Sequence, residues 1–274
     1  MRAKFWRVGL LGLVAIVLSL IHFNFDRYQQ QFGQTASTPA SPILVAAAAS
    51  LQPALQAIAS TYTQANPNPA VNYNFAASGV LAQQIQQGAP VDVFIAAAEK
   101  QMFALAQQGL LAAGTPRTLL TNQLVLIAPK QSLVSLTNWR QLTAPAIKRI
   151  AIGEPRTVPA GQYATEVFQN LGILESIKSK FILGNSVKSV LTAVETGNVD
   201  AGIVYVTDAK NSSKVQIVAI ADDKLHSPIN YPIAILKSSK SPTKSRQYVE
   251  FLHSKSAIAI FKKYGFGIAK SQSL

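Results

Sequence analysis

Short apolar runs alternate with amphipathic segments from residue 43 to the C-terminus, a pattern that is typical of α/β proteins. The apolar runs predict strands over 43–48, 70–75, 91–97, 123–129, 149–153, 201–206, 215–220 and 231–236. Apolar positions spaced three and four apart predict helices over 52–65, 79–87, 99–107, 160–170, 174–179, 187–196 and 242–264. Because strands alternate with helices, we expect mainly parallel sheets flanked by helices.

Breaks in this pattern favour two lobes, although a single doubly wound sheet could also hold these elements. Gly114-Thr115-Pro116 closes the first strand–helix series, and Ser227-Pro228 precedes a strand and a long final helix. We therefore expect lobe 1 over 43–122 plus 231–274 and lobe 2 over 123–230.

The N-terminus carries an export signature. MRAKFWR has three positive charges, and the apolar stretch VGLLGLVAIVLSLI follows it without a charge. Residues 5–25 form a segment of 21 residues, close to the roughly 20 that span a bilayer. Residues 1–28 are therefore predicted to be either a cleaved signal peptide or an uncleaved membrane anchor. Polar, small residues over 29–42 predict a flexible linker. In both cases we expect a periplasmic protein, tethered to the cytoplasmic membrane if the N-terminal segment is not cleaved.

Composition narrows the function classes further. The chain has 25 Lys and Arg against 12 Asp and Glu, a net charge of +13, and it contains no cysteine. Disulfides and thiolate metal sites are thereby excluded. The positive charges are dispersed without aromatic interleaving, so nucleic-acid binding is not expected.

Sequence signatures of catalysis are missing. The chain has no GxGxxG, GxxxxGK[ST], HExxH or GxSxG motif. Its three histidines are His22, His226 and His253, and its carboxylates are scattered without an obvious pair. We therefore predict no catalytic residues, no resident metal and no cofactor, and a binding protein rather than an enzyme.

Small-residue turns follow several predicted strands, and each opens a helix. Ser50 follows four alanines, Ser78 precedes Gly79, and Val158-Pro159-Ala160-Gly161 and Asn185-Ser186-Val187 follow the same plan. Free backbone N–H groups and helix dipoles at such turns suit an anion. The alternative interpretation is that the serines are ordinary helix N-caps, that Ala160 and Gly161 only permit a tight turn, and that Tyr205 packs in the core.

The order of these segments resembles the periplasmic molybdate-binding proteins of ABC importers. The resemblance is carried by AAAASL, NFAASGVLAQQIQQGAPVDVFIAA, QLVLIAPK, AIGEPRTVPAGQYA, GIVYVTDA and IFKKYGFGIA, from residue 43 almost to the C-terminus. It implies two α/β lobes joined by crossing strands, the type II periplasmic-binding-protein fold, with a tetrahedral oxyanion in the cleft. One departure is Ala-Ser-Gly at 77–79, where some members have a run of serines.

The resemblance also implies a ligand set and partners. Ser50 and Ser78 would each give a backbone N–H and a hydroxyl, Ala160 and Val187 backbone N–H groups, and Tyr205 its phenol. The protein would capture molybdate or tungstate as a monomer and deliver it to the membrane permease subunits of an ABC importer.

Three alternatives remain. Another tetrahedral oxyanion such as sulfate also presents only acceptors; phosphate is disfavoured, because none of the five positions offers a carboxylate to accept the ligand's proton. An enzyme on the same two-lobe scaffold would need a titratable residue in the cleft, for which Glu154 and Asp208 are the candidates. A membrane-anchored interaction module would show no stabilisation by ligand.

Overall fold

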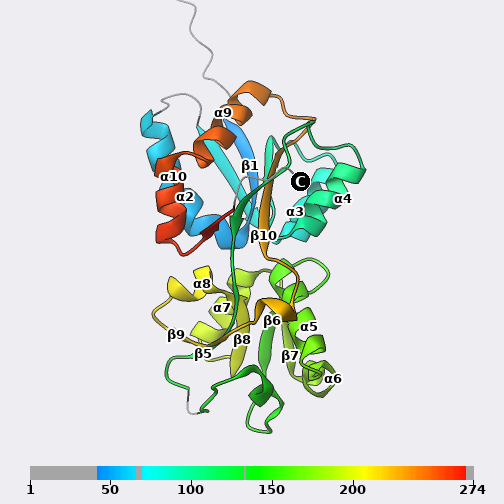
Figure 1. Ribbon diagram of the computed structural model, residues 1–274, viewed down its shortest axis with the longest axis vertical. Helices are drawn as coiled ribbons and strands as arrows, with labels where there is room; N and C mark the ends of the chain where they lie inside the picture. The colour runs from blue at the N-terminus through cyan, green and yellow to red at the C-terminus, as the bar shows by residue number, and fades with distance from the viewer. Residues whose placement is uncertain (1–41, 66–69, 133, 270–274) are drawn as a thin grey trace, which may run out of the picture. The chain divides into compact units, whose positions relative to one another are not determined.

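The described part of the chain forms two lobes, each built on a mixed sheet flanked by helices (Figure 1). The computed structural model describes residues 42–65, 70–132 and 134–269; the predicted signal or anchor (1–28) lies outside them, as does all but the last residue of the predicted linker. The two-lobe α/β fold predicted from the sequence is confirmed. Within the described ranges, no helix combines the length and apolar character needed to cross a membrane.

The first lobe has a six-stranded sheet in the order β11-β4-β10-β3-β1-β2. Its strands are β1 (Ile43–Ala48), β2 (Val71–Ala76), β3 (Val93–Ile95), β4 (Arg117–Thr121), β10 (Asn230–Ile235) and β11 (Gly267–Ile268). Its helices are the 3-10 helix η1 (Ala49–Leu51), α2 (Gln52–Ala65), α3 (Ser78–Gln86), α4 (Glu99–Gln107), α9 (Pro242–Leu252) and α10 (Lys255–Lys263).

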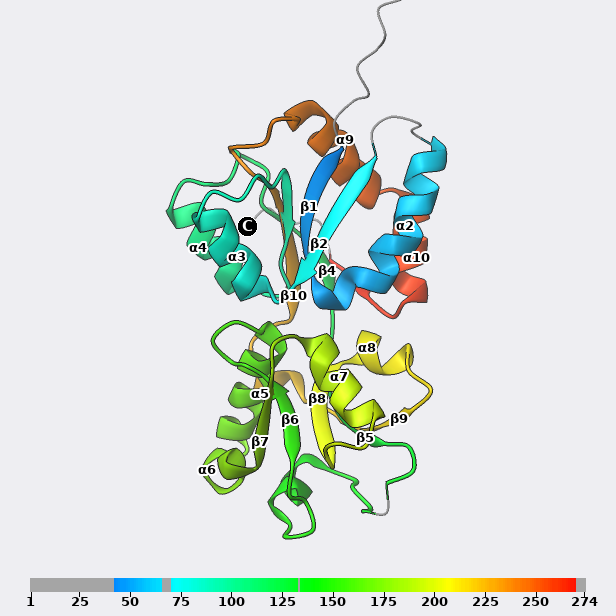
Figure 2. The ribbon, with the colours of Figure 1, turned by 180° about the vertical axis from the view of Figure 1, so that it is seen from behind.

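Helices cover both faces of this sheet, with α2, α9 and α10 on one side and α3 and α4 on the other (Figures 1 and 2). The central strand β1 is buried on both faces. Val45 belongs to the larger core cluster with Leu55 of α2, while Ala46 packs in a separate cluster with Leu81 of α3. This two-sided burial explains why 43–48 is a continuous apolar run rather than an alternating one.

The second lobe has a five-stranded sheet in the order β7-β6-β8-β5-β9. Its strands are β5 (Leu124–Pro129), β6 (Ile150–Gly153), β7 (Phe181–Gly184), β8 (Ala201–Tyr205) and β9 (Val215–Ile220). Its helices are α5 (Pro159–Asn170), α6 (Leu174–Ile177), α7 (Val187–Glu195) and α8 (Val206–Lys210), with the 3-10 helices η2 (Trp139–Thr143), η3 (Lys178–Lys180) and η4 (Asp223–Leu225).

The sheets are mixed rather than mainly parallel as predicted. Strand β10 runs antiparallel to β3 and β4, and β5 runs antiparallel to β8 and β9. The reason is that the chain passes twice between the lobes, from β4 to β5 and from β9 to β10. The strand that follows each crossing, β5 or β10, enters its sheet against the direction of its neighbours. The predicted lobe boundaries, 43–122 with 231–274 and 123–230, stay a prediction.

Several short elements were not predicted, namely β4, β7, β11 and α8. Strand β7 leaves Ile182 and Leu183 exposed at a sheet edge, so its residues lack the burial pattern of the other strands.

The predicted helix over 242–264 is wrong as a single element. It breaks at residues 253–254 into α9 and α10, because the Ser254 hydroxyl accepts a hydrogen bond from the Ala257 N–H and starts a new helix.

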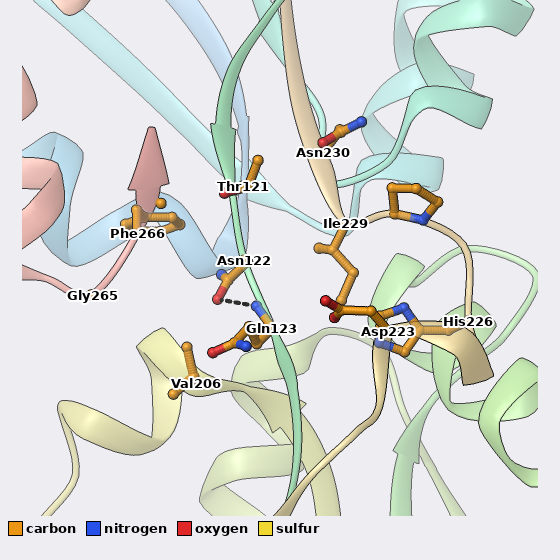
Figure 3. Close-up of a pocket in the computed structure, with 12 residues that line it drawn as sticks. Thr121, Asn122, Gln123, Val206, Asp223, His226, Ile229, Asn230, Gly265 and Phe266 are labelled. Carbon is orange, nitrogen blue, oxygen red and sulfur yellow. Dashed lines mark hydrogen bonds between the residues drawn. The ribbon is translucent and has the colours of Figure 1, made fainter. Parts of the chain in front are cut away.

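The two crossings lie side by side. The Asn122 N–H, between β4 and β5, donates to the Ile229 carbonyl oxygen on the way into β10 at 3.1 Å. Figure 3 shows Asn122 and Ile229 on these neighbouring segments. The paired crossings are the covalent connection between the lobes and therefore the natural hinge.

Candidate functional site

Ser50 lies where β1 ends and the chain turns into η1 and α2. Its side chain is buried, and its Oγ lies 3.0 Å from the Tyr231 hydroxyl. The N-cap residue of η1 is Ala48, with no side-chain cap. The N-cap interpretation of Ser50 is therefore wrong, and its hydroxyl is engaged in a tertiary contact instead.

Ser78 is the first residue of α3 and is fully buried. Its Oγ accepts a hydrogen bond from the Ala97 N–H at 2.9 Å, and the N-cap position belongs to Ala77. Since the oxygen is occupied as an acceptor, the hydroxyl hydrogen is free to be donated elsewhere. Like Ser50, Ser78 is not an N-cap serine.

In the second lobe, the turn from β6 to α5 places Ala160 in the first turn of that helix, with Pro159 before it. A Cβ on Gly161 would lie 1.9 Å from the Gly153 carbonyl oxygen, so only glycine lets the start of α5 approach the end of β6 so closely. Backbone N–H groups in the first turn of a helix have no partner within the helix. The VPAG segment thus brings such groups to the edge of the sheet.

Val187 is the first residue of α7, and Tyr205 is the last residue of β8. The N-cap interpretation holds for Ser186, whose hydroxyl accepts from the Ser189 N–H at 3.2 Å. Tyr205 is buried, its hydroxyl has no hydrogen-bond partner among the described residues, and burial raises the pKa of this phenol well above its ordinary value. A buried, protonated phenol without a partner is a donor available to a ligand.

One narrow pocket, with a cavity volume of about 10 Å³, brings these residues together, and both lobes contribute to it. It is lined by Ala48, Ala49, Ser50, Ala76, Ala77, Ser78, Ala97, Val158, Pro159, Ala160, Val187 and Tyr205. All five predicted ligand residues are among them, and none of the described lining residues carries a formal charge. The remaining lining residues are small or apolar, so the polar groups that face the pocket are hydroxyl groups and backbone groups.

The charged candidates for an enzyme lie outside this pocket. Glu154 forms an ion pair with the exposed Arg156 at 3.1 Å, and the hydrogen bond from Arg156 lowers the pKa of that carboxyl. Asp208 is buried in the first turn of α8 and accepts from the Tyr205 N–H at 3.2 Å. Burial raises the pKa of Asp208 to about 7, partly opposed by the charge of Lys188. Neither carboxyl group lines the pocket, so neither is placed to act on a ligand there.

A larger cavity, of about 550 Å³, lies along the hinge crossings (Figure 3). Its lining includes Asn122, Gln123, His226 and Asn230 but none of the predicted ligand residues. Its buried His226 uses Nδ1 for a contact with the Ser227 carbonyl oxygen. Among the described residues, no group of three or more His, Asp or Glu side chains is arranged to hold a metal ion.

Sequence reasoning did not include Tyr231, which contacts Ser50, or the Ala97 N–H, which binds Ser78. Tyr231 begins an apolar run, and nothing in the sequence links it to a serine 181 positions away. The turns at Ser50 and Ser78 carry a local signal because helix starts are local features. Partners that come from another strand carry none.

The fold and the pocket define a class: a two-lobe binding protein with a hydrogen-bond-donating pocket between its lobes. The family described as bacterial extracellular solute-binding protein matches residues 43–267. The chain belongs to this family.

Relatives that sequence comparison identifies are named as binding proteins. The chain is similar to the molybdate-binding protein ModA of Escherichia coli, with 38% identity over 82% of this chain and 89% of that protein. It is likewise 37% identical to ModA of Haemophilus influenzae, again over 82% of this chain and 89% of that protein. Among solved structures, it resembles the periplasmic molybdate-binding protein of Azotobacter vinelandii, with a TM-score of 0.76 and 26% identity over 83% of this chain and all of the other.

Proposed function

We propose that this protein captures molybdate or tungstate outside the cytoplasm and delivers it to the permease subunits of an ABC importer. The observation that carries the proposal is the convergence of Ser50, Ser78, Ala160, Val187 and Tyr205 on one uncharged pocket. Hydroxyl and N–H donors, together with the positive ends of helices α3, α5 and α7, provide a complete environment for a fully deprotonated oxyanion. No counter-cation is needed in direct contact.

The relatives support the proposed molybdate binding. The two bacterial proteins compared above are named as molybdate-binding, and their similarity extends over most of both chains. They are binding proteins rather than enzymes, in agreement with the expectation from the sequence. The protein works without a cofactor in this proposal, and its ligand is a transported substrate.

Export is part of the proposal. The family is described as extracellular, and the N-terminal pattern over 1–28 is that of a signal peptide or membrane anchor. We place the two lobes in the periplasm, acting as a monomer, with the linker over 29–42 between them and the N-terminal segment.

Titration calorimetry with molybdate, tungstate, sulfate and phosphate tests the function. We expect one oxyanion per chain and much tighter binding of molybdate and tungstate than of sulfate. A ligand that binds only the folded state stabilises it by about 2.7 kcal/mol at a hundredfold excess over Kd, so the melting temperature should rise as well. An unchanged melting temperature in millimolar molybdate would refute the proposal.

The same titrations separate the alternatives. A sulfate receptor would reverse the order of affinities. An interaction module would respond to none of the four anions. The Ser50→Ala/Tyr205→Phe double variant is the matched control, because a pocket that does not hold the anion would leave its response equal to that of the wild type.

A further inference from the structure

Ser50 depends on a second hydroxyl for its orientation. The Tyr231 side chain is fully buried, and its hydroxyl lies 3.0 Å from Ser50 Oγ. Either oxygen could be the donor in this pair. Which one donates decides whether the Ser50 hydrogen points into the pocket or away from it, since each hydroxyl has a single hydrogen.

The Tyr231 hydroxyl has a second partner at the hinge, the side chain of Asn122. Asn122 Oδ1 accepts a hydrogen bond from the Gln123 N–H at 2.9 Å (Figure 3), which fixes the orientation of its amide group. Its Nδ2 therefore faces the Tyr231 hydroxyl at 3.1 Å and Thr207 Oγ1 at 3.0 Å. An amide nitrogen can only donate, so Tyr231 accepts from Asn122.

The Tyr231 oxygen accepts from Asn122 through one lone pair, and its hydrogen remains to be donated. We assign this hydrogen to Ser50 Oγ, which lies 3.0 Å away. Ser50 then accepts from Tyr231 and has its own hydrogen left for the pocket. Burial raises the pKa of Tyr231, so the phenol keeps this hydrogen at neutral pH.

We propose that Tyr231 and Asn122 are positioning residues that orient the Ser50 hydroxyl as a donor to the bound oxyanion. The proposal rests on the proposed function. Ser78 needs no such relay because the backbone N–H of Ala97 already occupies its oxygen. At Ser50 the same task falls to two side chains on the crossing segments, and Thr207 of α8 ties the relay to the second lobe.

The relay also bears on selectivity. A hydroxyl whose hydrogen is directed at the ligand favours an oxyanion that presents only acceptors. A protonated oxyanion such as hydrogen phosphate would place a donor against a donor unless it turned its protonated oxygen away. Removing the Tyr231 or Asn122 side chain should therefore weaken molybdate binding. It should also reduce the difference in affinity between molybdate and protonated anions.

A double-mutant cycle tests the relay by calorimetry on the full-length protein with molybdate. We expect Tyr231→Phe to weaken affinity about three- to tenfold, since it keeps the ring and removes only the hydroxyl. In a Ser50→Ala background, the same substitution should change affinity by less than twofold. Tyr248→Phe is the matched control, because Tyr248 is a buried tyrosine of the same lobe whose hydroxyl bonds to Tyr73 at 2.7 Å and does not line the pocket.

Asn122→Ala is the second arm and does not depend on the folding of the Tyr231 variant. It should weaken molybdate binding, and this loss should also disappear in the Ser50→Ala background. If either loss persists undiminished without the Ser50 hydroxyl, the residue acts only through general packing and the relay is wrong. If both single variants bind as tightly as the wild type, the relay is wrong too. Failure of the wild type itself to bind molybdate would instead overturn the proposed function.

Discussion

The backbone N–H of Gly79 donates a hydrogen bond to the carbonyl oxygen of Thr157 at 2.9 Å. Gly79 belongs to α3 in the first lobe, and Thr157 lies in the turn before α5 in the second. A Cβ on Gly79 would lie 2.6 Å from this carbonyl oxygen and 2.7 Å from the Thr157 Cα. The lobes thus meet backbone to backbone beside the pocket, and this contact must separate when the cleft opens.

This contact predicts an effect of Gly79→Ala on closure. The added methyl group would hold the lobes apart in the closed state, so we expect molybdate affinity to fall by about tenfold or more. The free protein should not lose stability, because alanine is favoured over glycine within a helix by about 1 kcal/mol. Calorimetry and thermal unfolding of the unliganded protein measure the two effects.

Gln83→Ala, on the exposed side of the same helix, is the control and should bind like the wild type. A Gly79→Ala protein that binds molybdate normally would show that the closed state does not need this close approach.

Local signals explain how much of the fold and site could be predicted. The turns at Ser50 and Ala160 were identifiable because a strand end, small residues and a helix start are adjacent in sequence. Strand β1 was predicted at its observed bounds because both its faces are buried. The resemblance to a known family then supplied Tyr205, which has no local signal of its own.

Long-range relationships explain what could not be predicted. Strand β4 pairs with β10 and β11 far along the chain, and β11 has two residues, too few to show a pattern. This chain has Ala77-Ser78-Gly79 where some members of the resembled family have a run of serines. In the structure, Gly79 instead makes the backbone contact with Thr157, which depends on a partner 78 positions away and has no counterpart in the local sequence.

A donor-based site predicts a specific pattern of losses. Ser50→Ala and Tyr205→Phe should each remove one hydrogen bond to a charged ligand. Such bonds are worth roughly 1.5–3 kcal/mol, or about ten- to hundredfold in affinity. Arg156→Gln and Lys188→Gln should have much smaller effects at physiological salt, since neither side chain lines the pocket. The charge of Arg156 is also exposed and is screened over about 8 Å.

Calorimetry at two ionic strengths checks this pattern. Binding that survives both hydroxyl substitutions but is abolished by either charge substitution would identify a cationic site and contradict the assignment.

Ser78→Ala should be costly in a different way. It removes a predicted ligand donor and also leaves the buried Ala97 N–H without its partner. An unsatisfied buried N–H costs about 1–3 kcal/mol, so the free protein should lose stability as well as affinity. Ser50→Ala is the comparison and should lose less stability, because the Tyr231 hydroxyl keeps its hydrogen bond from Asn122 and can rotate its own hydrogen, whereas the Ala97 N–H is fixed in direction. Urea unfolding without ligand separates the two variants; equal stabilities would contradict the assigned role of the Ala97 contact.

Asp208 predicts a pH dependence of stability. Its pKa is raised from 3.8 to about 7 by burial, although the charge of Lys188 and the Tyr205 N–H oppose the shift. Between these two pH values the folded state holds more protons than the unfolded state, so the free energy of unfolding falls as pH rises. The cost of ionising the buried carboxyl group reaches its full size as the pH rises past 7 and amounts to roughly 4 kcal/mol.

Asp208→Asn keeps an acceptor for the Tyr205 N–H and removes the titration. We therefore expect this variant to be more stable than the wild type at pH 8 and to lose this component of the pH dependence between pH 4 and 8. Urea unfolding of both proteins across that range is the measurement. Parallel stability curves for the two proteins would mean that Asp208 is already ionised in the folded state at low pH, since only a carboxyl group that stays protonated on folding can produce the predicted slope.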